Sequence, residues 1–193
     1  MSEKRQFLRA LLRNPLGVGA ITPSSRDLAR MMIADVKPTP DEIILELGVG
    51  TGAITAEIQQ ILVEPNSYLG IEIDGSLVEM VKAKFPDLNI VNADACSACD
   101  LHSSLELGKV RYIVSGIPFV SLPKNICEEI LGNIGEFMEF GCMFRTFQYV
   151  HGYYTPPAMR MREYMNKRFG PMKKSPVVLK NIPPAVTLTW STV

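Results

Sequence analysis

A glycine-rich stretch at residues 46–52 has the spacing that most clearly predicts chemistry in this chain. Gly48, Gly50 and Gly52 alternate with other residues between an apolar run and a helical stretch. Glycines placed two residues apart allow a tight turn after a buried strand, and they let a ligand approach the backbone closely. The first N–H groups of the following helix point to the same place. The stretch therefore predicts a site for a nucleotide-like cofactor in a strand–turn–helix unit.

The glycines alone leave two cofactor classes open. The stretch also fits the dinucleotide fingerprint, with Ala53 as the third small residue, whereas a P-loop is excluded because no Gly-Lys-Ser/Thr follows. Glu46 stands two residues before the first glycine, and E-x-G-x-G-x-G resembles motif I of the class I methyltransferases. That resemblance implies S-adenosylmethionine (SAM) as the cofactor, S-adenosylhomocysteine as its product, and Glu46 as part of the cofactor site.

Two further acids follow predicted strands. Glu72 ends the second strand, 20 residues past Gly52, where a carboxylate can accept hydrogen bonds from both ribose hydroxyls. NAD-binding domains share this feature. Asp94 and Ala95 follow the third strand, and the methyltransferase resemblance implies that an acid and its neighbour here bind the adenine amino group. The sequence thus predicts Glu72, Asp94 and Ala95 as cofactor-binding residues.

The segment 115–119 follows the fourth predicted strand and is the candidate reaction centre. Adenine N-methyltransferases carry Asn/Asp-x-Pro-Tyr/Phe here, whereas alignment on Pro118 places Gly116 at the Asn/Asp position, with Ser115 just before it. Ser115 is therefore a candidate catalytic residue. Tyr153 is a second candidate, as a proton acceptor or as an aromatic face for a methylated cation, although core packing explains an aromatic segment equally well.

Alternating strands and helices must position these residues. The pattern predicts an α/β, Rossmann-like fold with a mostly parallel seven-stranded sheet, an antiparallel C-terminal hairpin and helices on both faces. One domain is expected over 1–193, with N-terminal helices in 1–36 and the Rossmann-like core in 41–193. Predicted strands cover 43–47, 68–73, 89–93, 111–115, 142–149, 177–179 and 185–190, and predicted helices cover 26–36, 53–62, 75–85, 124–139 and 157–169.

The N-terminal segment predicts a surface-seeking helix. Arg5, Arg9 and Arg13 recur every four residues beside a stripe formed by Phe7, Leu8, Leu11 and Leu12. Such a helix suits a membrane interface, or alternatively packs over the edge of its own fold. Ser24 and Ser25 end the loop that follows; they either line the cofactor site or cap the next helix.

Charge is balanced overall but unevenly distributed. Residues 1–35 carry six Lys/Arg against three Asp/Glu, residues 145–193 carry eight against one, and the middle of the chain is acidic. Two basic ends predict attraction to an anionic membrane surface, with ordinary solvated helices as the alternative. No apolar run reaches the length of a bilayer span and no signal peptide is visible, so a cytoplasmic, peripherally membrane-associated protein is expected.

The four cysteines include a C-x-x-C at 96–99, but no second pair and no histidine at ligand spacing accompanies it. Neither of the two histidines, His102 and His151, has that spacing. We therefore expect no bound metal and reduced thiols.

The whole pattern resembles the bacterial phospholipid N-methyltransferases and their ornithine-lipid relatives. The matching stretches are 7–8, 18–25, 46–52, 115–118 and 181–185. The resemblance implies SAM-dependent methylation of the amine of phosphatidylethanolamine or an ornithine-type aminolipid at the membrane surface, with nucleic acid disfavoured as a partner and the oligomeric state open. Two alternatives stay open: an rRNA adenine N6-methyltransferase, and a SAM-binding protein without catalytic activity.

Overall fold

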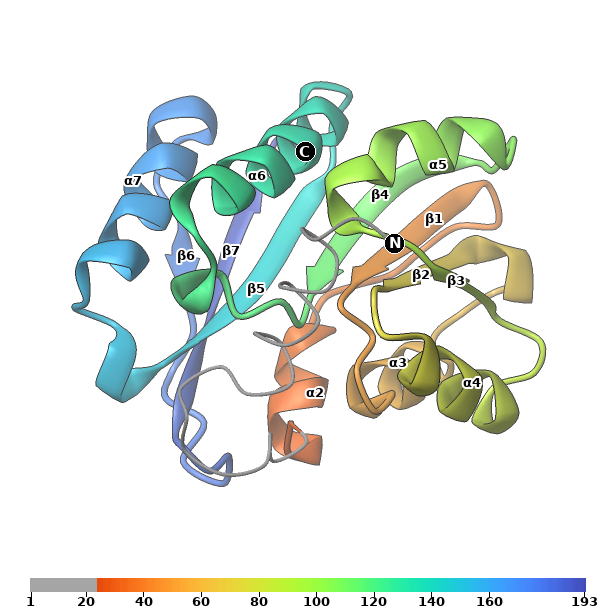
Figure 1. The fold of residues 1–193 in the computed structure, drawn as a ribbon, viewed down its shortest axis with the longest axis horizontal. Helices are drawn as coiled ribbons and strands as arrows, with labels where there is room; N and C mark the ends of the chain where they lie inside the picture. Colours follow the sequence, from red (N-terminus) through yellow and green to blue (C-terminus); the bar gives the residue numbers. More distant parts are fainter. Residues whose placement is uncertain (1–23) are drawn as a thin grey trace.

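A computed structural model describes residues 24–193 and shows a seven-stranded sheet in the order β3-β2-β1-β4-β5-β7-β6 (Figure 1). The first five strands are parallel, and β7 runs antiparallel to both of its neighbours. The strands are β1 (Glu42–Leu47), β2 (Tyr68–Glu72), β3 (Asn89–Asn92), β4 (Lys109–Ser115), β5 (Met143–Tyr149), β6 (Lys173–Lys174) and β7 (Ala185–Ser191).

Helices cover both faces of this sheet. One face carries α5, α6 and α7, and the other carries α2, α3 and α4 (Figure 1). Their bounds are α2 (Arg26–Met32), α3 (Ala53–Ile58), α4 (Gly75–Lys84), α5 (Ala98–Ser104), α6 (Lys124–Glu139) and α7 (Pro156–Phe169). The predicted fold class, including the antiparallel C-terminal hairpin, is confirmed.

The sheet order places the ligand site. The chain crosses outwards from β1 through β2 to β3, then returns to the other side of β1 with β4. The loops after β1 and β4 therefore diverge from neighbouring strand ends, and α/β sheets bind ligands at this switch point. Leu47 pairs with both Ile71 and Ser115, so the three strands end level with one another.

The predicted strand at 177–179 is wrong. The short edge strand is β6, whereas Val178 makes a single antiparallel bridge to Ala185. Pro176 before the segment and Pro183 after it lack the N–H that a ladder needs, so pairing does not extend there. The structure also contains α5, which the sequence analysis did not predict.

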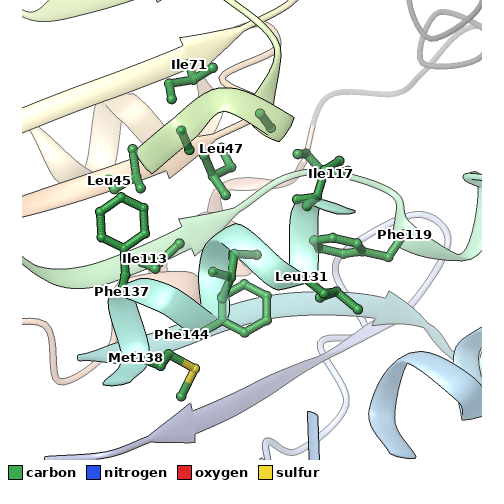
Figure 2. Close-up of a cluster of buried hydrophobic side chains, with 14 of the residues drawn as sticks. Leu45, Leu47, Ile71, Ile113, Ile117, Phe119, Leu131, Phe137, Met138 and Phe144 are labelled. Atoms are coloured by element: carbon green, nitrogen blue, oxygen red, sulfur yellow. The ribbon is translucent and has the colours of Figure 1, made fainter. Parts of the chain in front are cut away.

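The largest buried cluster lies between the sheet and α6 (Figure 2). Leu45 and Leu47 point to this face, while Ile44 and Glu46 point to the opposite face beneath α2 and α3. Phe144 contributes a ring that stacks on Trp190 with centroids 5.7 Å apart. This rigid core holds the strand ends, and hence the loops after them, in fixed positions.

The start of the described chain is tied to the sheet by a buried arginine. Arg145 on β5 donates to the carbonyl oxygens of Met31, Met32 and Ala34 and to the Thr189 hydroxyl. Burial lowers the pKa of its guanidinium. The predicted amphipathic helix around Arg5, Arg9 and Arg13 lies outside the described residues. Among the helices from residue 24 onwards, none combines the length and apolar character that crossing a bilayer requires.

Candidate cofactor site

The glycine loop adopts a conformation that suits close approach of a ligand. Gly48, Gly50 and Gly52 have φ values of +75°, +58° and +81°, in the left-handed region that favours glycine. A Cβ built on Gly48 would meet Ile117 at 2.9 Å, whereas one built on Gly50 would meet nothing within 4 Å. The loop is thus packed on its inner side and open at Gly50.

Glu72 lies directly beside this opening. Its Oε2 accepts a hydrogen bond from the Gly50 N–H at 2.9 Å, and its Oε1 accepts one from the Asp74 N–H at 2.8 Å. Burial raises the pKa of Glu72, and the two backbone donors counteract part of that rise. A carboxylate oriented by the loop itself can accept hydrogen bonds from the hydroxyls of a ribose.

Asp94 and Ala95 complete the same pocket. They line it together with Gly48 and Glu72, and Ile71 and Ile117 form part of its apolar wall. The Asp94 Oδ1 accepts the Cys96 N–H at 3.0 Å, so its carboxylate is oriented from the start of the next helical turn. Two acids in a pocket whose other walls are largely apolar suit the polar edges and the flat faces of a nucleoside. The described residues therefore fit the predicted adenosine-containing cofactor.

Glu46 is fully buried beneath the loop rather than in the pocket wall. Its Oε2 accepts hydrogen bonds from the Tyr68 hydroxyl at 2.7 Å and the Thr55 hydroxyl at 2.8 Å, while Oε1 has no partner within residues 24–193. Burial raises the pKa of Glu46 to about 8. Gly70 makes room for this arrangement, because a Cβ there would lie 2.5 Å from the Tyr68 hydroxyl.

Glu46 predicts a pH-dependent stability. Its folded pKa of about 8 exceeds the ordinary 4.5, so the folded state holds a proton that the unfolded state releases between these values. The free energy of unfolding contributed by this group should fall as pH rises through that window, by about 1.4 kcal/mol per pH unit. Glu46→Gln should remove this dependence. Urea unfolding of both proteins from pH 5 to pH 8 measures it, and parallel slopes would contradict the assignment.

Ser115 is buried at the end of β4. Its Oγ accepts the Ile117 N–H at 3.2 Å and donates to the Leu47 carbonyl oxygen at 3.4 Å. The hydroxyl thereby links the loops after β1 and β4. The next residue, Gly116, has no space for a side chain, because its Cβ would lie 2.7 Å from the Gly48 carbonyl oxygen.

Ser25 caps α2, which is one of the two roles predicted for it. Its Oγ accepts the Leu28 N–H at 3.2 Å, and its own N–H donates to the Asn181 Oδ1 at 2.8 Å. Neither Ser24 nor Ser25 is among the described residues that line the cofactor pocket. Asn181, which is buried and joins two predicted motif stretches 156 residues apart, was not singled out from the sequence.

Tyr153 lies against α7 rather than in the cofactor pocket. The Arg162 guanidinium sits 3.9 Å from its ring centroid, and the Lys174 ammonium 5.0 Å. Arg162, one of the eight basic residues in 145–193, also donates to the Tyr153 carbonyl oxygen and to Gln148, and it is buried. Arg168 similarly pairs with Glu139. Fewer basic side chains are therefore available at the surface near the C-terminus than the count of lysines and arginines in 145–193 suggests.

A second pocket adjoins the first. It lies between α6, α7 and the turn after β4, and Leu122 lines both pockets. Phe119 and Leu131 form apolar parts of its wall, whereas Lys124 and Arg160 bring positive charge to it. Glu128 also lines it and pairs with Lys124 at 3.7 Å.

The cysteines do not form a metal centre in the described chain. Cys96, Cys99, Cys127 and Cys142 form no disulfide among the described residues, and no group of three His, Cys, Asp or Glu side chains from residue 24 onwards is arranged to hold an ion. Burial is the main cause that raises the pKa of Cys99 and of Cys142 to about 12. These thiols are therefore protonated at neutral pH.

The fold and the pocket define a class I, SAM-dependent methyltransferase, and comparison with known proteins agrees. The family described as ribosomal RNA adenine dimethylase matches residues 24–137, more than half of the chain. The chain therefore belongs to the ribosomal RNA adenine dimethylase family.

Individual relatives carry two kinds of name. An ornithine lipid N-methyltransferase from Singulisphaera acidiphila is 22% identical over 127 residues, which cover 64% of this chain and 66% of the relative. A ribosomal RNA small subunit methyltransferase A from Chlorobium limicola is 31% identical over 108 residues, which cover 56% of this chain and 38% of the relative. A relative from Cupriavidus metallidurans is also named ribosomal RNA small subunit methyltransferase A. Family and relatives support the adenine alternative more broadly than the lipid prediction.

Solved structures share the fold at low identity. Magnesium protoporphyrin IX methyltransferase from Synechocystis PCC 6803, solved with bound SAM, has a TM-score of 0.64 at 9% identity and covers 100% of this chain and 99% of its own. A SAM-dependent methyltransferase from Anabaena variabilis has a TM-score of 0.60 at 14% identity, and the match covers 97% of this chain and 93% of that protein.

Proposed function

We propose that the chain methylates the amine of a polar lipid, such as phosphatidylethanolamine or an ornithine-type aminolipid, with SAM as donor. The observation that carries this proposal is the loop after β4. Adenine N-methyltransferases place an Asn or Asp two residues before the proline, and here Gly116 occupies that position against the Gly48 carbonyl oxygen. An acceptor side chain for a planar adenine amine has no room there.

The second pocket supports a lipid acceptor. Its apolar wall at Phe119 and Leu131 suits hydrocarbon, and Lys124 and Arg160 suit a phosphate or carboxylate of the headgroup. Since Leu122 lines both pockets, an acceptor bound there is adjacent to the cofactor pocket.

The chain's own residues contribute binding and orientation. Glu72 would hold the ribose of SAM, and Asp94 with Ala95 its adenine, while the loop at Gly48, Gly50 and Gly52 lets the cofactor lie against the backbone. SAM supplies an electrophilic methyl group to a neutral amine. Holding two reactants in line can supply most of the rate acceleration without a covalent intermediate. Tyr153 lines neither pocket, so its role at the reacting amine stays a prediction from the sequence.

Adenine methylation in ribosomal RNA is the second candidate. It is favoured by the family match over 24–137 and by the names of several relatives. The two candidates share the cofactor site and differ only in what the loop after β4 and the second pocket receive.

A lipid profile tests the proposal. The chain is expressed in a bacterium that makes phosphatidylethanolamine but no methylated derivatives, beside a Glu72→Ala variant that should bind SAM poorly. We expect mono-, di- or trimethylated aminolipids with the native chain alone. An unchanged lipid profile together with newly dimethylated adenines in ribosomal RNA would replace the lipid proposal with the second candidate.

Ser115→Ala should lower turnover more than SAM affinity. The substitution removes the hydroxyl that accepts the Ile117 N–H, and one such hydrogen bond is worth roughly 1 kcal/mol, so kcat should fall by about threefold to tenfold. Ser104→Ala is the matched control, because that hydroxyl only bonds within α5. Steady-state kinetics and calorimetry measure the two effects. Unchanged kcat would limit Ser115 to a packing role.

A further inference from the structure

Two neighbouring loops expose large apolar side chains. Leu179, Ile182 and Tyr154 are 75%, 77% and 80% exposed, respectively. Leu179 and Ile182 lie in the loop before β7, and Tyr154 lies in the turn after β5. Val150 and Val177 on the same loops are also exposed. Several large apolar side chains exposed on adjoining loops are typical of an interaction surface.

The loops lie on the cofactor edge of the sheet. β5 runs parallel to β4, so its C-terminal end is on the same edge as the loop after β4. β7 is antiparallel to β5 and pairs Ala185 with Tyr149, so the loop before β7 reaches that edge too (Figure 1). The apolar side chains therefore stand on the edge at which the methyl group is transferred.

Hydrogen bonds hold the two loops together. The Val150 N–H of the first loop donates to the Pro184 carbonyl oxygen of the second at 2.9 Å. The Val178 N–H donates to the Ala185 carbonyl oxygen at 2.8 Å and closes the second loop on itself. Asn181 further secures the second loop, because its side-chain amide bonds the Pro183 carbonyl oxygen and the Ser25 N–H. The exposed side chains are thus presented from a backbone that is fixed to the fold.

The charges on these loops identify the kind of partner. The segments 148–155 and 175–184 contain no Asp or Glu, and Lys180 stands between Leu179 and Ile182 in the sequence. Lys173 and Lys174 are exposed on the adjoining edge strand. Apolar tips beside cations match a layer of anionic headgroups above hydrocarbon.

We propose that the loops at 150–154 and 177–182 form the lipid-facing surface of this protein, with Leu179, Ile182 and Tyr154 entering an anionic membrane and Lys180 at its headgroups. This proposal rests on the proposed function, because the surface would bring the cofactor edge of the sheet to the amine of a membrane lipid. It does not need the N-terminal segment.

The test compares Leu179→Ser/Ile182→Ser with Phe140→Ser. Phe140 is a matched control, because it is 75% exposed at the opposite end of the sheet, before β5 begins. Co-sedimentation with phosphatidylglycerol/phosphatidylcholine vesicles should be about tenfold weaker for the double variant and unchanged for the control. Thermal unfolding and SAM binding should be unchanged in both.

A reporter at the surface gives a second measurement. Leu179→Trp places an indole on the loop, and the native Trp190 is buried, so a change in emission on vesicle addition comes from position 179. We expect a blue shift with anionic vesicles. Vesicle binding without a shift, or equal binding by the double variant and the Phe140→Ser control, would overturn the proposed surface.

Methylation of a detergent-dispersed aminolipid separates this proposal from the proposed function. Activity on dispersed lipid, with vesicle binding indifferent to Leu179 and Ile182, overturns the surface and leaves the function. Vesicle binding lost in the double variant, with no lipid methylated by the native chain, supports the surface and overturns the function.

Discussion

Gly50→Val is expected to weaken SAM binding by more than about 100-fold, the largest effect on the cofactor that one substitution in the glycine loop should give. A Cβ at Gly50 meets nothing within 4 Å of the protein, and the Gly50 N–H bonds the Glu72 carboxylate, so valine would project beside the predicted ribose site. The φ of +58° adds strain of roughly 1–2 kcal/mol for a residue with a side chain. Calorimetric titration with SAM measures the loss.

Gly132→Val separates that effect from a general response to valine. Gly132 lies in α6, and a Cβ there also meets nothing within 4 Å. Its variant should bind SAM as the native chain does. Equal losses in both variants would mean that Gly50 acts through stability, and native affinity in Gly50→Val would remove the loop from the cofactor site.

Gly116→Asn is expected to impair the enzyme rather than convert it to an adenine methyltransferase. Its Cβ would lie 2.7 Å from the Gly48 carbonyl oxygen, so the loops after β1 and β4 would separate. Such overpacking costs about 1–3 kcal/mol, and cofactor binding should weaken with it. Urea unfolding and SAM titration measure the two losses.

Gly152→Asn is the matched control, because a Cβ at Gly152 meets nothing within 4 Å. That variant should keep native stability and SAM affinity. A Gly116→Asn protein that binds SAM normally and methylates adenine in RNA would contradict the steric argument on which the lipid proposal rests.

Most of the parallel sheet was predictable because β1, β2, β4 and β5 contain short apolar runs and are followed by helices. Ile43 to Leu47 and the glycines after it are typical of this signal. The edge of the sheet was less predictable. Apolar residues at 177–179 resemble a strand, yet prolines on both sides stop the pairing, and the two residues that do pair are lysines.

The positions of the cofactor residues followed from the strand ends, since Glu72 is the last residue of β2 and Asp94 comes two residues after β3. Their partners did not follow. Tyr68 and Thr55 bond Glu46 from two different elements, and Asn181 bonds Ser25 across 156 residues. Contacts of this kind depend on how elements pack, which periodicity does not encode. The tyrosine–glycine pair at 68 and 70 in β2 is a signal that could have indicated a buried polar contact.

Charge counts also overstate the basic surface. Arg145 and Arg162 lie within the fold, where they bond carbonyl oxygens, and Arg168 pairs with Glu139. Sequence alone assigns each of them to the surface because buried arginines are uncommon. The exposed cations near the cofactor edge include Lys124, Arg160 and Lys180.

The most direct test offers the purified protein both acceptors at once. Vesicles containing phosphatidylethanolamine and unmethylated small ribosomal subunits are mixed with SAM that carries a tritiated methyl group, and the lipid and RNA fractions are then separated and counted. The lipid proposal predicts label in the aminolipid fraction and none above background in RNA. Label confined to adenine in the RNA would contradict it and assign the chain the activity after which its family is described.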